Sequence, residues 1–280
     1  MDANSPLDPV KSRLPLGIIP AGSTDVISCS VHGVRDPVTA ALHIVLGHLQ
    51  QVDMCSFSTL GQSVHFGFSA MFGFGGRSLA LAEKKRWMSS SRRREYALIK
   101  TLARLRCKTF FYKLNNNNID PILQSLIDAE GIEETWTTKQ GLYLSISIMS
   151  IPCLSPHAPR GLAPNTRYAN GSASLIAVGN TTRSEFIKHL KRYNSSSGQL
   201  NFSFVEAHDV SAVRVGPLSQ VGCSKEESEE EEEEAFFPWN IDGELVEIAN
   251  EVLIKVHPRL ITLYGEEVDE VESTASCSCI

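Results

Sequence analysis

The chain has 280 residues, of which 42% are hydrophobic, and it carries a formal net charge of −6. This length allows one large domain or two smaller ones with a sizeable core, and we expect a soluble, globular protein. The longest apolar stretches, such as Gly141–Pro152, are far shorter than the roughly 20 residues that cross a bilayer. No apolar run precedes Leu14, so an integral membrane protein and a secretory signal are both excluded, and a cytoplasmic location is expected.

Cysteine and histidine usage gives no sign of a covalent or metal framework. The 7 cysteines form an odd, scattered set without the paired spacing of zinc sites, which is typical of reduced thiols in a cytosolic protein. The 8 histidines are dispersed, and no histidine–cysteine pair has the spacing of a nucleophile or ligand set. We therefore predict neither a structural disulfide nor a metal cage.

The N-terminal part divides into two segments. Residues 1–14 are polar and are predicted to be disordered, whereas residues 15–51 have the pattern of part of an α/β domain. In Leu14–Gly22, the apolar residues Leu16, Ile18 and Ile19 predict a buried strand that runs into a turn, and Thr39–Gln50 has helical spacing. A buried strand of this type depends on neighbouring strands. At its exposed edge we expect a protein partner, a missing N-terminal half or aggregation.

The turn at Gly22–Asp25 has two interpretations. Backbone N–H groups at the start of a helix carry partial positive charge, so a strand, a small-residue turn and a helix start form a candidate phosphate site. The same turn is also an ordinary helix cap, in which Ser23, Thr24 or Asp25 accepts hydrogen bonds from free amides. Spacing alone favours the cap.

From residue 52 to residue 264 the pattern becomes mainly β, with a β-sandwich-like domain expected, and the tail 265–280 is predicted to be disordered. Two helices are expected, at 95–106 and 182–193. Strands are expected at 52–58, 63–75, 108–114, 141–151, 174–178, 201–205 and 212–215, and two more, broken near Asn250, within 244–265. The predicted fold class is therefore an α/β remnant followed by a mainly β domain.

Charge is concentrated in two segments. Eight of the nine residues from Glu226 to Glu234 are glutamates, within a predicted loop at 224–235, and without them the chain is mildly basic. Lys84, Lys85, Arg86, Arg92, Arg93 and Arg94 surround Trp87 and a serine cluster. This basic cluster could contact anionic phospholipid headgroups or act as a two-part nuclear import signal, although a solvated helix face gives the same pattern. The acidic loop is either a mobile insertion or a segment that folds over the basic cluster.

Two short motifs carry a family resemblance. LGIIPAGSTD at Leu16–Asp25 and WNIDGELVE at Trp239–Glu247 resemble the lipid kinase superfamily of ceramide, sphingosine and diacylglycerol kinases, with the closest likeness to its ceramide kinase-like branch. The resemblance extends from about Leu14 to Tyr264. In that family an upstream Gly-Gly-Asp-Gly loop supplies phosphate-binding backbone and the carboxylate that activates the lipid hydroxyl, and no such string occurs here. The sequence thus resembles part of a lipid kinase, as a short isoform or an incomplete gene product.

The resemblance implies a nucleotide site built from two loops. It assigns Gly22, Ser23, Thr24 and Asp25 to the nucleotide loop, with Thr24 where glycine is commoner and Asp25 where asparagine is commoner. It also assigns Asp242, Gly243 and Glu244 to a signature near the nucleotide phosphates, where the two carboxylates would hold Mg²⁺. Without the family, Asp-Gly indicates only a hairpin turn.

Two further positions follow from the resemblance. Asp53 matches an acidic residue near the family's metal network, although an aspartate at a strand edge explains it equally well. Arg77 stands where ceramide and sphingosine kinases carry an aspartate that contacts the polar end of the lipid. An arginine cannot accept hydrogen bonds but can bind a phosphate or carboxylate, so the preferred lipid is predicted to be anionic.

The sequence therefore predicts a ceramide kinase-like lipid kinase family member. The family reaction is ATP-dependent phosphorylation of a sphingolipid or diacylglycerol hydroxyl, with ATP and Mg²⁺ as cofactors. Loss of an acid–base group alone costs about 10² to 10⁴ in rate, so this chain is expected to be inactive alone. The alternative is a non-catalytic module that binds lipids or proteins.

The expected partner is a membrane lipid, either a sphingolipid or an anionic lipid, and no nucleic acid is expected. The C-terminal CSCI loosely fits a prenylation box, although a plain reduced tail fits better.

Overall fold

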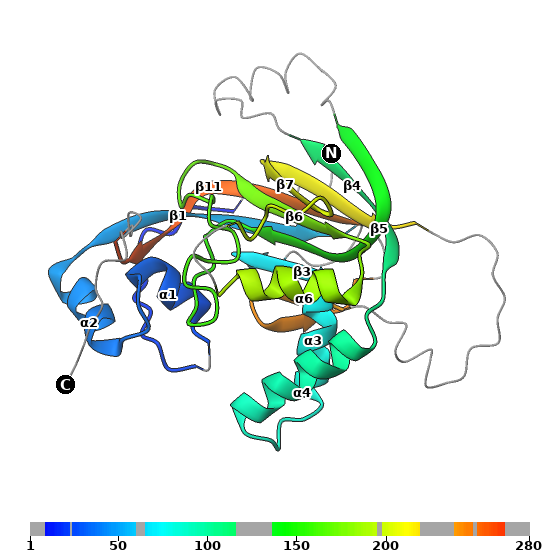
Figure 1. The fold of residues 1–280 in the computed structure, drawn as a ribbon. Coiled ribbons are helices and arrows are strands. Elements are labelled where there is room, and N and C mark those ends of the chain that lie inside the picture. The colour runs from blue at the N-terminus through cyan, green and yellow to red at the C-terminus, as the bar shows by residue number, and fades with distance from the viewer. Residues whose placement is uncertain are drawn as a thin grey trace, which may run out of the picture.

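The computed structural model describes residues 9–22, 24–59, 65–115, 136–194, 198–218, 238–248 and 251–266. Ser23, the glutamate run 229–234 and the C-terminal CSCI lie outside the described residues, so the predictions made for them stay predictions. The fold is mixed α and β, with most strands in a curled sheet (Figure 1). None of the helices in the described ranges has the length and apolar character needed to cross a bilayer.

The helices are α1 Val26–His32, α2 Pro37–Leu46, α3 Phe74–Glu83, α4 Ser90–Ala103 and α6 Arg183–Arg192. The strands are β1 Leu49–Ser58, β2 His65–Gly67, β3 Ser69–Gly73, β4 Lys108–Asn115, β5 Thr137–Met149, β6 Ala173–Gly179, β7 Val205–Val210, β8 Ala212–Pro217, β9 Trp239–Ile241, β10 Glu244–Val246 and β11 Val252–Tyr264.

The sheet closes on itself at one residue. Its strand order within the described ranges is β10-β9-β3-β5-β4-β8-β11-β1-β2, with β6 paired to β5 and β7, and the paired strands run antiparallel. β2 is the last strand of this order and β3 is the third, yet Phe68 alone separates them in the chain. The two ends of the sheet must therefore come together at Phe68, which explains the curl.

The core lies on both faces of this sheet. Inside the curl, Phe57, Tyr112, Ile146 and Ile254 are almost fully buried together. The outer face of the sheet is covered by α6, whose Phe186 packs edge-on against Phe74 with ring centroids 4.9 Å apart. Six residues in a row of β6 are buried, because this strand has the core on one side and α6 on the other.

Most predicted strands are confirmed, including the break before β11. Two predictions are wrong. Asn201–Val205 is a turn, with backbone hydrogen bonds from Asn201 to Gly198 and from Val205 to Phe202, and β7 begins only at Val205. Leu16–Gly22 is not a buried strand, because Leu16 forms only an isolated parallel bridge to Leu263 and is 51% exposed. A single neighbour cannot bury both faces of a strand.

The first segment also presents an apolar surface. Large hydrophobic side chains are exposed over it, namely Val10, Leu14, Leu16, Ile19, Val34, Val38, Leu42, Val45, Leu46 and Leu49. An exposed set of this size marks an interaction surface more often than a free one. These exposed side chains are therefore the candidate surface for the protein partner predicted for this segment, and the partner itself stays a prediction.

Candidate functional site

The Asp-Gly-Glu motif forms a tight hairpin between β9 and β10. Ile241 pairs with Glu244, so Asp242 and Gly243 are the two central residues, and both have positive φ, at 46° and 93°. Hairpins with positive φ at both central positions favour Asp-Gly. The side chain of Asn240 accepts a hydrogen bond from the Gly243 amide at 2.9 Å, which fixes the turn further. The local sequence thus dictates the turn that holds Asp242 and Glu244.

The Asp242 carboxylate reaches across to the closure of the sheet. It accepts hydrogen bonds from the Phe68 amide at 2.8 Å, the Ser69 amide at 2.8 Å and the Ser69 hydroxyl at 2.9 Å. A Cβ at Gly67 would lie 2.7 Å from Oδ2 of Asp242, so only glycine leaves room for this contact. One carboxylate therefore holds the junction between β2 and β3 and is itself held in a single orientation.

The electrostatics of this turn suit a cation. Although Asp242 as a residue is exposed, its carboxylate sits among the atoms of the β2–β3 junction, and this burial raises its pKa. The nearby charge of Glu244 also raises it, against the lowering effect of the hydrogen bonds from Phe68 and Ser69. A cation near Asp242 and Glu244 would relieve both unfavourable effects. Two carboxylates, one fixed and one exposed, are a donor set that fits Mg²⁺.

Asp53 lies at a bulge in the pairing of β1 with β11. It is fully buried, and its two oxygens accept hydrogen bonds from the Gly171 amide at 2.6 Å and the Arg259 amide at 2.7 Å. The register shifts at this point between Val52 and Met54. Burial raises the pKa of Asp53, while the two amides lower it in part. The carboxylate thus anchors the bulge, and metal binding by Asp53 stays a prediction.

Asp53 and Asp242 are connected through Ser150 and Phe68. The Ser150 hydroxyl lies 3.0 Å from the carbonyl oxygen of Asp53 and 3.3 Å from that of Phe68, whose amide donates to Asp242. Burial raises the pKa of Cys55 to about 12, the nearby Ser150 hydroxyl lowers it in part, and the negative charges of Asp242 and Asp53 raise it further. The structure thus brings near each other two of the three carboxylates predicted as metal ligands, although they are 189 positions apart in the chain. Each is nevertheless held by its own set of backbone amides.

The predicted nucleotide loop is closed by an ion pair. Asp25 precedes α1 with a positive φ of 53°, and its side chain caps no helical amide, so the interpretation of Asp25 as an ordinary cap is wrong. This backbone conformation turns the carboxylate back to the Gly22 amide at 2.7 Å, where Arg35 Nε also donates to it at 2.6 Å. Burial tends to raise the pKa of Asp25, but the bonds from Arg35 and Gly22 outweigh it and lower the pKa. A phosphate would have to displace Asp25 to reach the Gly22 amide.

Arg77 is buried at the start of α3. Its Nη1 donates to the carbonyl oxygen of Arg104, which follows α4, at 3.0 Å. Helices α3 and α4 form a helical hairpin, and this bond joins them at its base. The structure therefore gives Arg77 a contact within the hairpin, and its predicted contact with a lipid headgroup stays a prediction.

Residues 68–280 match the ceramide kinase C-terminal domain, and residues 3–57 match the diacylglycerol kinase catalytic domain. The chain belongs to the ceramide kinase family. It is 51% identical to the human ceramide kinase-like protein over 97% of this chain and 50% of that protein, and 27% identical to human ceramide kinase over 93% of this chain and 56% of that enzyme. The chain thus spans about half the length of these relatives.

The fold itself has solved counterparts. A crystal structure of a putative diacylglycerol kinase from Bacillus anthracis str. Sterne matches with a TM-score of 0.55 and 13% identity, over 90% of this chain and 68% of that chain. This likeness shows a shared fold.

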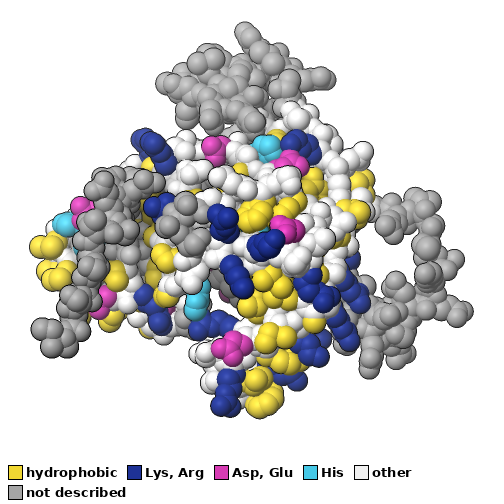
Figure 2. Space-filling model, viewed as in Figure 1, with side chains coloured by type: hydrophobic (Ala, Val, Ile, Leu, Met, Phe, Trp, Pro, Cys, Tyr) yellow, Lys and Arg dark blue, Asp and Glu magenta, His cyan; other side chains and the backbone are white. Residues whose placement is uncertain are grey.

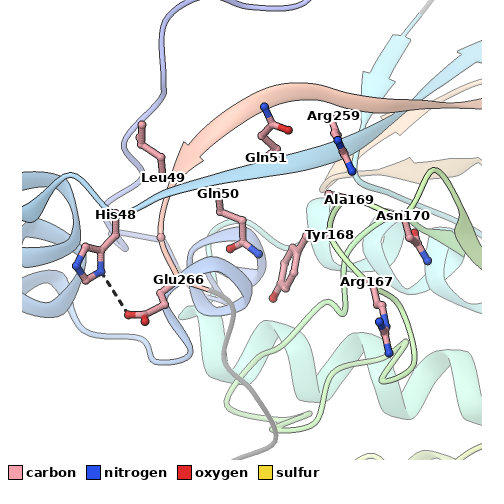
Figure 3. A pocket seen from close by; sticks show the side chains of 11 residues that line it. His48, Leu49, Gln50, Gln51, Arg167, Tyr168, Ala169, Asn170, Arg259 and Glu266 are labelled. Atoms are coloured by element: carbon pink, nitrogen blue, oxygen red, sulfur yellow. Dashed lines mark ion pairs between the residues drawn. The ribbon is translucent and has the colours of Figure 1, made fainter.

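A cavity in this ceramide kinase family member was missed by sequence reasoning. It has a volume of about 710 Å³ and lies beside β1 and the end of β11 (Figure 3). It is lined by His48, Leu49, Gln50, Gln51, Arg167, Tyr168, Ala169, Asn170, Arg259, Gly265 and Glu266. These residues come from three distant parts of the chain, 48–51, 167–170 and 259–266, so no local motif could have indicated the cavity.

Proposed function

We propose that the chain is the lipid-recognising part of a ceramide kinase-like lipid kinase, and that it contributes one carboxylate turn to a nucleotide site without phosphorylating a lipid on its own. The family reaction transfers phosphate from ATP to a sphingolipid or diacylglycerol hydroxyl. The observation that carries the proposal is the Asp242–Glu244 hairpin, with Asp242 held by Phe68 and Ser69 where the sheet closes.

Phosphoryl transfer needs a phosphate cradle, a carboxylate-held Mg²⁺ and a group that accepts the hydroxyl proton. Asp242 and Glu244 would hold the metal ion, which would neutralise charge on the phosphates of bound ATP. Asp242 keeps one orientation because three donors hold it, so a cation would meet one fixed carboxylate and the exposed carboxylate of Glu244. No Gly-Gly-Asp-Gly string is present to supply the cradle and the base, which supports the proposal that the chain alone is inactive.

The test measures transfer of labelled phosphate from MgATP to ceramide, sphingosine and diacylglycerol by the 280-residue chain, after circular dichroism has shown that it is folded. We expect no transfer. The proposed inactivity would be overturned if the parent chain transfers phosphate, if Asp242→Asn or Glu244→Gln abolishes this transfer, and if Glu247→Gln preserves it. Glu247 is a suitable control because it is exposed and follows the same hairpin.

A second candidate function, lipid binding without catalysis, is favoured by the surface of the α3–α4 hairpin. This hairpin projects from the sheet, and basic and apolar side chains gather on it (Figures 1 and 2). Trp87 at its tip is 80% exposed, and Ile99 on α4 is 65% exposed. Between Lys84 and Arg94 there are six basic residues and no acidic one. Tryptophan beside lysine and arginine suits the interface of an anionic membrane.

The charges of the basic cluster are placed for such a contact. Lys84, Arg86 and Arg92 are exposed near Trp87. Arg86 is also ion-paired with Glu83 at the end of α3, and Arg94 lies 3.3 Å from His157. A basic residue near an anionic membrane contributes about 1 kcal/mol, so the cluster is sufficient for reversible attachment. We therefore propose that the hairpin tip docks on anionic phospholipid.

Sedimentation with vesicles tests this docking. The double variant Arg92→Glu with Arg93→Glu is expected to bind vesicles of phosphatidylserine and phosphatidylcholine at least about 30-fold more weakly, since two charges are lost and then reversed. Lys11→Glu with Arg13→Glu reverses the same charge outside the hairpin and is expected to bind like the parent chain. Equal binding of both variants, or equal binding to pure phosphatidylcholine vesicles, would contradict the proposal.

Trp87→Ala separates the membrane from the nuclear import alternative. Import depends on the basic residues alone, whereas membrane docking also uses the indole. Weaker vesicle binding by Trp87→Ala with unchanged nuclear entry of a fluorescent fusion would assign the indole to the membrane. Unchanged vesicle binding would leave the cluster as a charge signal.

A further inference from the structure

Two histidines and a glutamate converge beside the cavity. His43 lies in α2, His48 lies between α2 and β1, and Glu266 follows β11. One ligand atom from each lies within 4.8 Å of the others, and Nδ1 of His48 is 3.3 Å from Oε2 of Glu266 (Figure 3). The rings of His43 and His48 are stacked, with centroids 5.3 Å apart. The three groups therefore face a common point.

Backbone hydrogen bonds hold all three positions. The His48 amide donates to the His43 carbonyl at 3.1 Å, and the Gly265 amide donates to the His48 carbonyl at 3.0 Å. The Glu266 amide donates to the Val31 carbonyl at 2.9 Å. The cluster is therefore a consequence of how α2, β1 and β11 meet, and it does not depend on long surface side chains that meet by chance.

The hydrogen bonds of His32 set the tautomer of His43. Nε2 of His32 is 2.9 Å from the Ile18 carbonyl, which can only accept, so Nε2 carries the proton. A neutral imidazole carries one N–H, so the Nδ1 of neutral His32 is an acceptor. Nδ1 of His43 lies 3.0 Å from that atom and must donate to it. In neutral His43 the lone pair is consequently on Nε2.

This chain of hydrogen bonds is the arrangement that metal-binding histidines use. A ligand histidine donates its other N–H to a second residue, which fixes its tautomer and ring orientation. His43 donates to His32, and His32 donates to Ile18. In addition, Nδ1 of His48 is shielded from solvent, and its 3.3 Å ion pair with Glu266 is not a hydrogen bond. A shielded nitrogen without a hydrogen bond is an available ligand atom.

We propose that His43, His48 and Glu266 form a zinc site with its fourth position open to the cavity. Two imidazoles and a carboxylate suit Zn²⁺, whereas Mg²⁺ prefers oxygen ligands alone. His48 and Glu266 also line the cavity, so the open position would take water or an anionic group. Arg167 and Arg259 in the cavity wall provide the positive charge for such an anion.

Zinc binding to the full chain tests the site. Equilibrium dialysis with Zn²⁺ alone is expected to give one ion per chain with an affinity in the micromolar range or tighter. His48→Ala and Glu266→Gln are each expected to weaken binding by about 10- to 100-fold. His65→Ala, which removes an exposed histidine on β2, is expected to bind as the parent chain does.

Substitution with Co²⁺ identifies the ligands independently. Binding through two imidazoles and a carboxylate is expected to give visible absorption of a four-coordinate ion without the near-ultraviolet band of cobalt–thiolate charge transfer. Because Glu266 is exposed, Glu266→Gln is expected to keep the circular dichroism spectrum of the parent chain. A thiolate band, or equal affinity in the parent, His48→Ala and Glu266→Gln, would overturn the proposal.

Discussion

Replacing Asp53 with alanine is expected to lower the free energy of unfolding by about 2–4 kcal/mol, because two backbone amides lose a buried, charged acceptor. Asp53 accepts from the Gly171 and Arg259 amides and is fully buried where β1 and β11 change register. Arg259 has a positive φ of 51°, and its bond to Asp53 holds this kink in β11. Urea unfolding monitored by circular dichroism measures the change.

Asp53→Asn is the matched control, since it keeps the volume and one acceptor oxygen. It is expected to cost less than half as much as Asp53→Ala. A loss below about 1 kcal/mol in the alanine variant would show that water satisfies the two amides and that the bulge needs no carboxylate.

The difference in stability between the parent chain and Asp53→Asn should depend on pH, because the pKa of Asp53 is raised. Because burial raises the pKa of the folded state above the ordinary value of 3.8, protonation favours the folded chain. This contribution is fully present below the ordinary pKa and is lost as the pH rises through the folded pKa. The parent chain should therefore lose stability relative to Asp53→Asn as the pH rises from about 4, in urea titrations across this range. If the parent chain instead gains stability relative to Asp53→Asn as the pH rises, the hydrogen bonds from the Gly171 and Arg259 amides, which lower the pKa of Asp53, outweigh its burial.

The sequence was sufficient for elements that depend on local pattern. The patterns of 174–178 and 182–193 predict a strand and an amphipathic helix, and the structure has both as β6 and α6. The Asp242–Gly243 turn was also predictable, because positive φ at two successive residues has a strong sequence preference. Local chemistry decides such elements before tertiary contacts form.

The remaining features depend on contacts between distant segments. The His43–His48–Glu266 cluster joins residues more than 200 positions apart, so histidine spacing could not reveal it. Asp25 was one of three residues predicted as the cap of α1, but Arg35, ten residues away, provides a better partner for its carboxylate. Leu16–Gly22 has the composition of a buried strand, but Leu16 has only the end of β11 beside it. In each case tertiary context overrides a correct local preference.

Replacing Gly76 with alanine is the second change with a large expected effect. A Cβ on Gly76 would lie 1.9 Å from the carbonyl oxygen of Pro238, which is backbone and cannot move without displacing β9. Alanine favours a helix by about 1 kcal/mol over glycine, so helix propensity alone would stabilise α3. We expect the clash to win and the free energy of unfolding to fall by about 2–4 kcal/mol in urea titrations. Ser78→Ala in the same helix controls for the change to alanine and is expected to have a small effect.

The same substitution tests whether the hairpin and the carboxylate turn are mechanically linked. Pro238 immediately precedes β9, and β9 leads into the turn that holds Asp242 at the closure of the sheet. If α3 is forced away from Pro238, the buried indole of Trp239 should become exposed, and its fluorescence should shift to longer wavelength in a background where Trp87 and Trp136 are replaced by phenylalanine. Destabilisation without a shift would place the strain within α3. A shift would mean that a force on the hairpin, such as docking on a membrane, reaches the turn proposed to hold the nucleotide's metal ion.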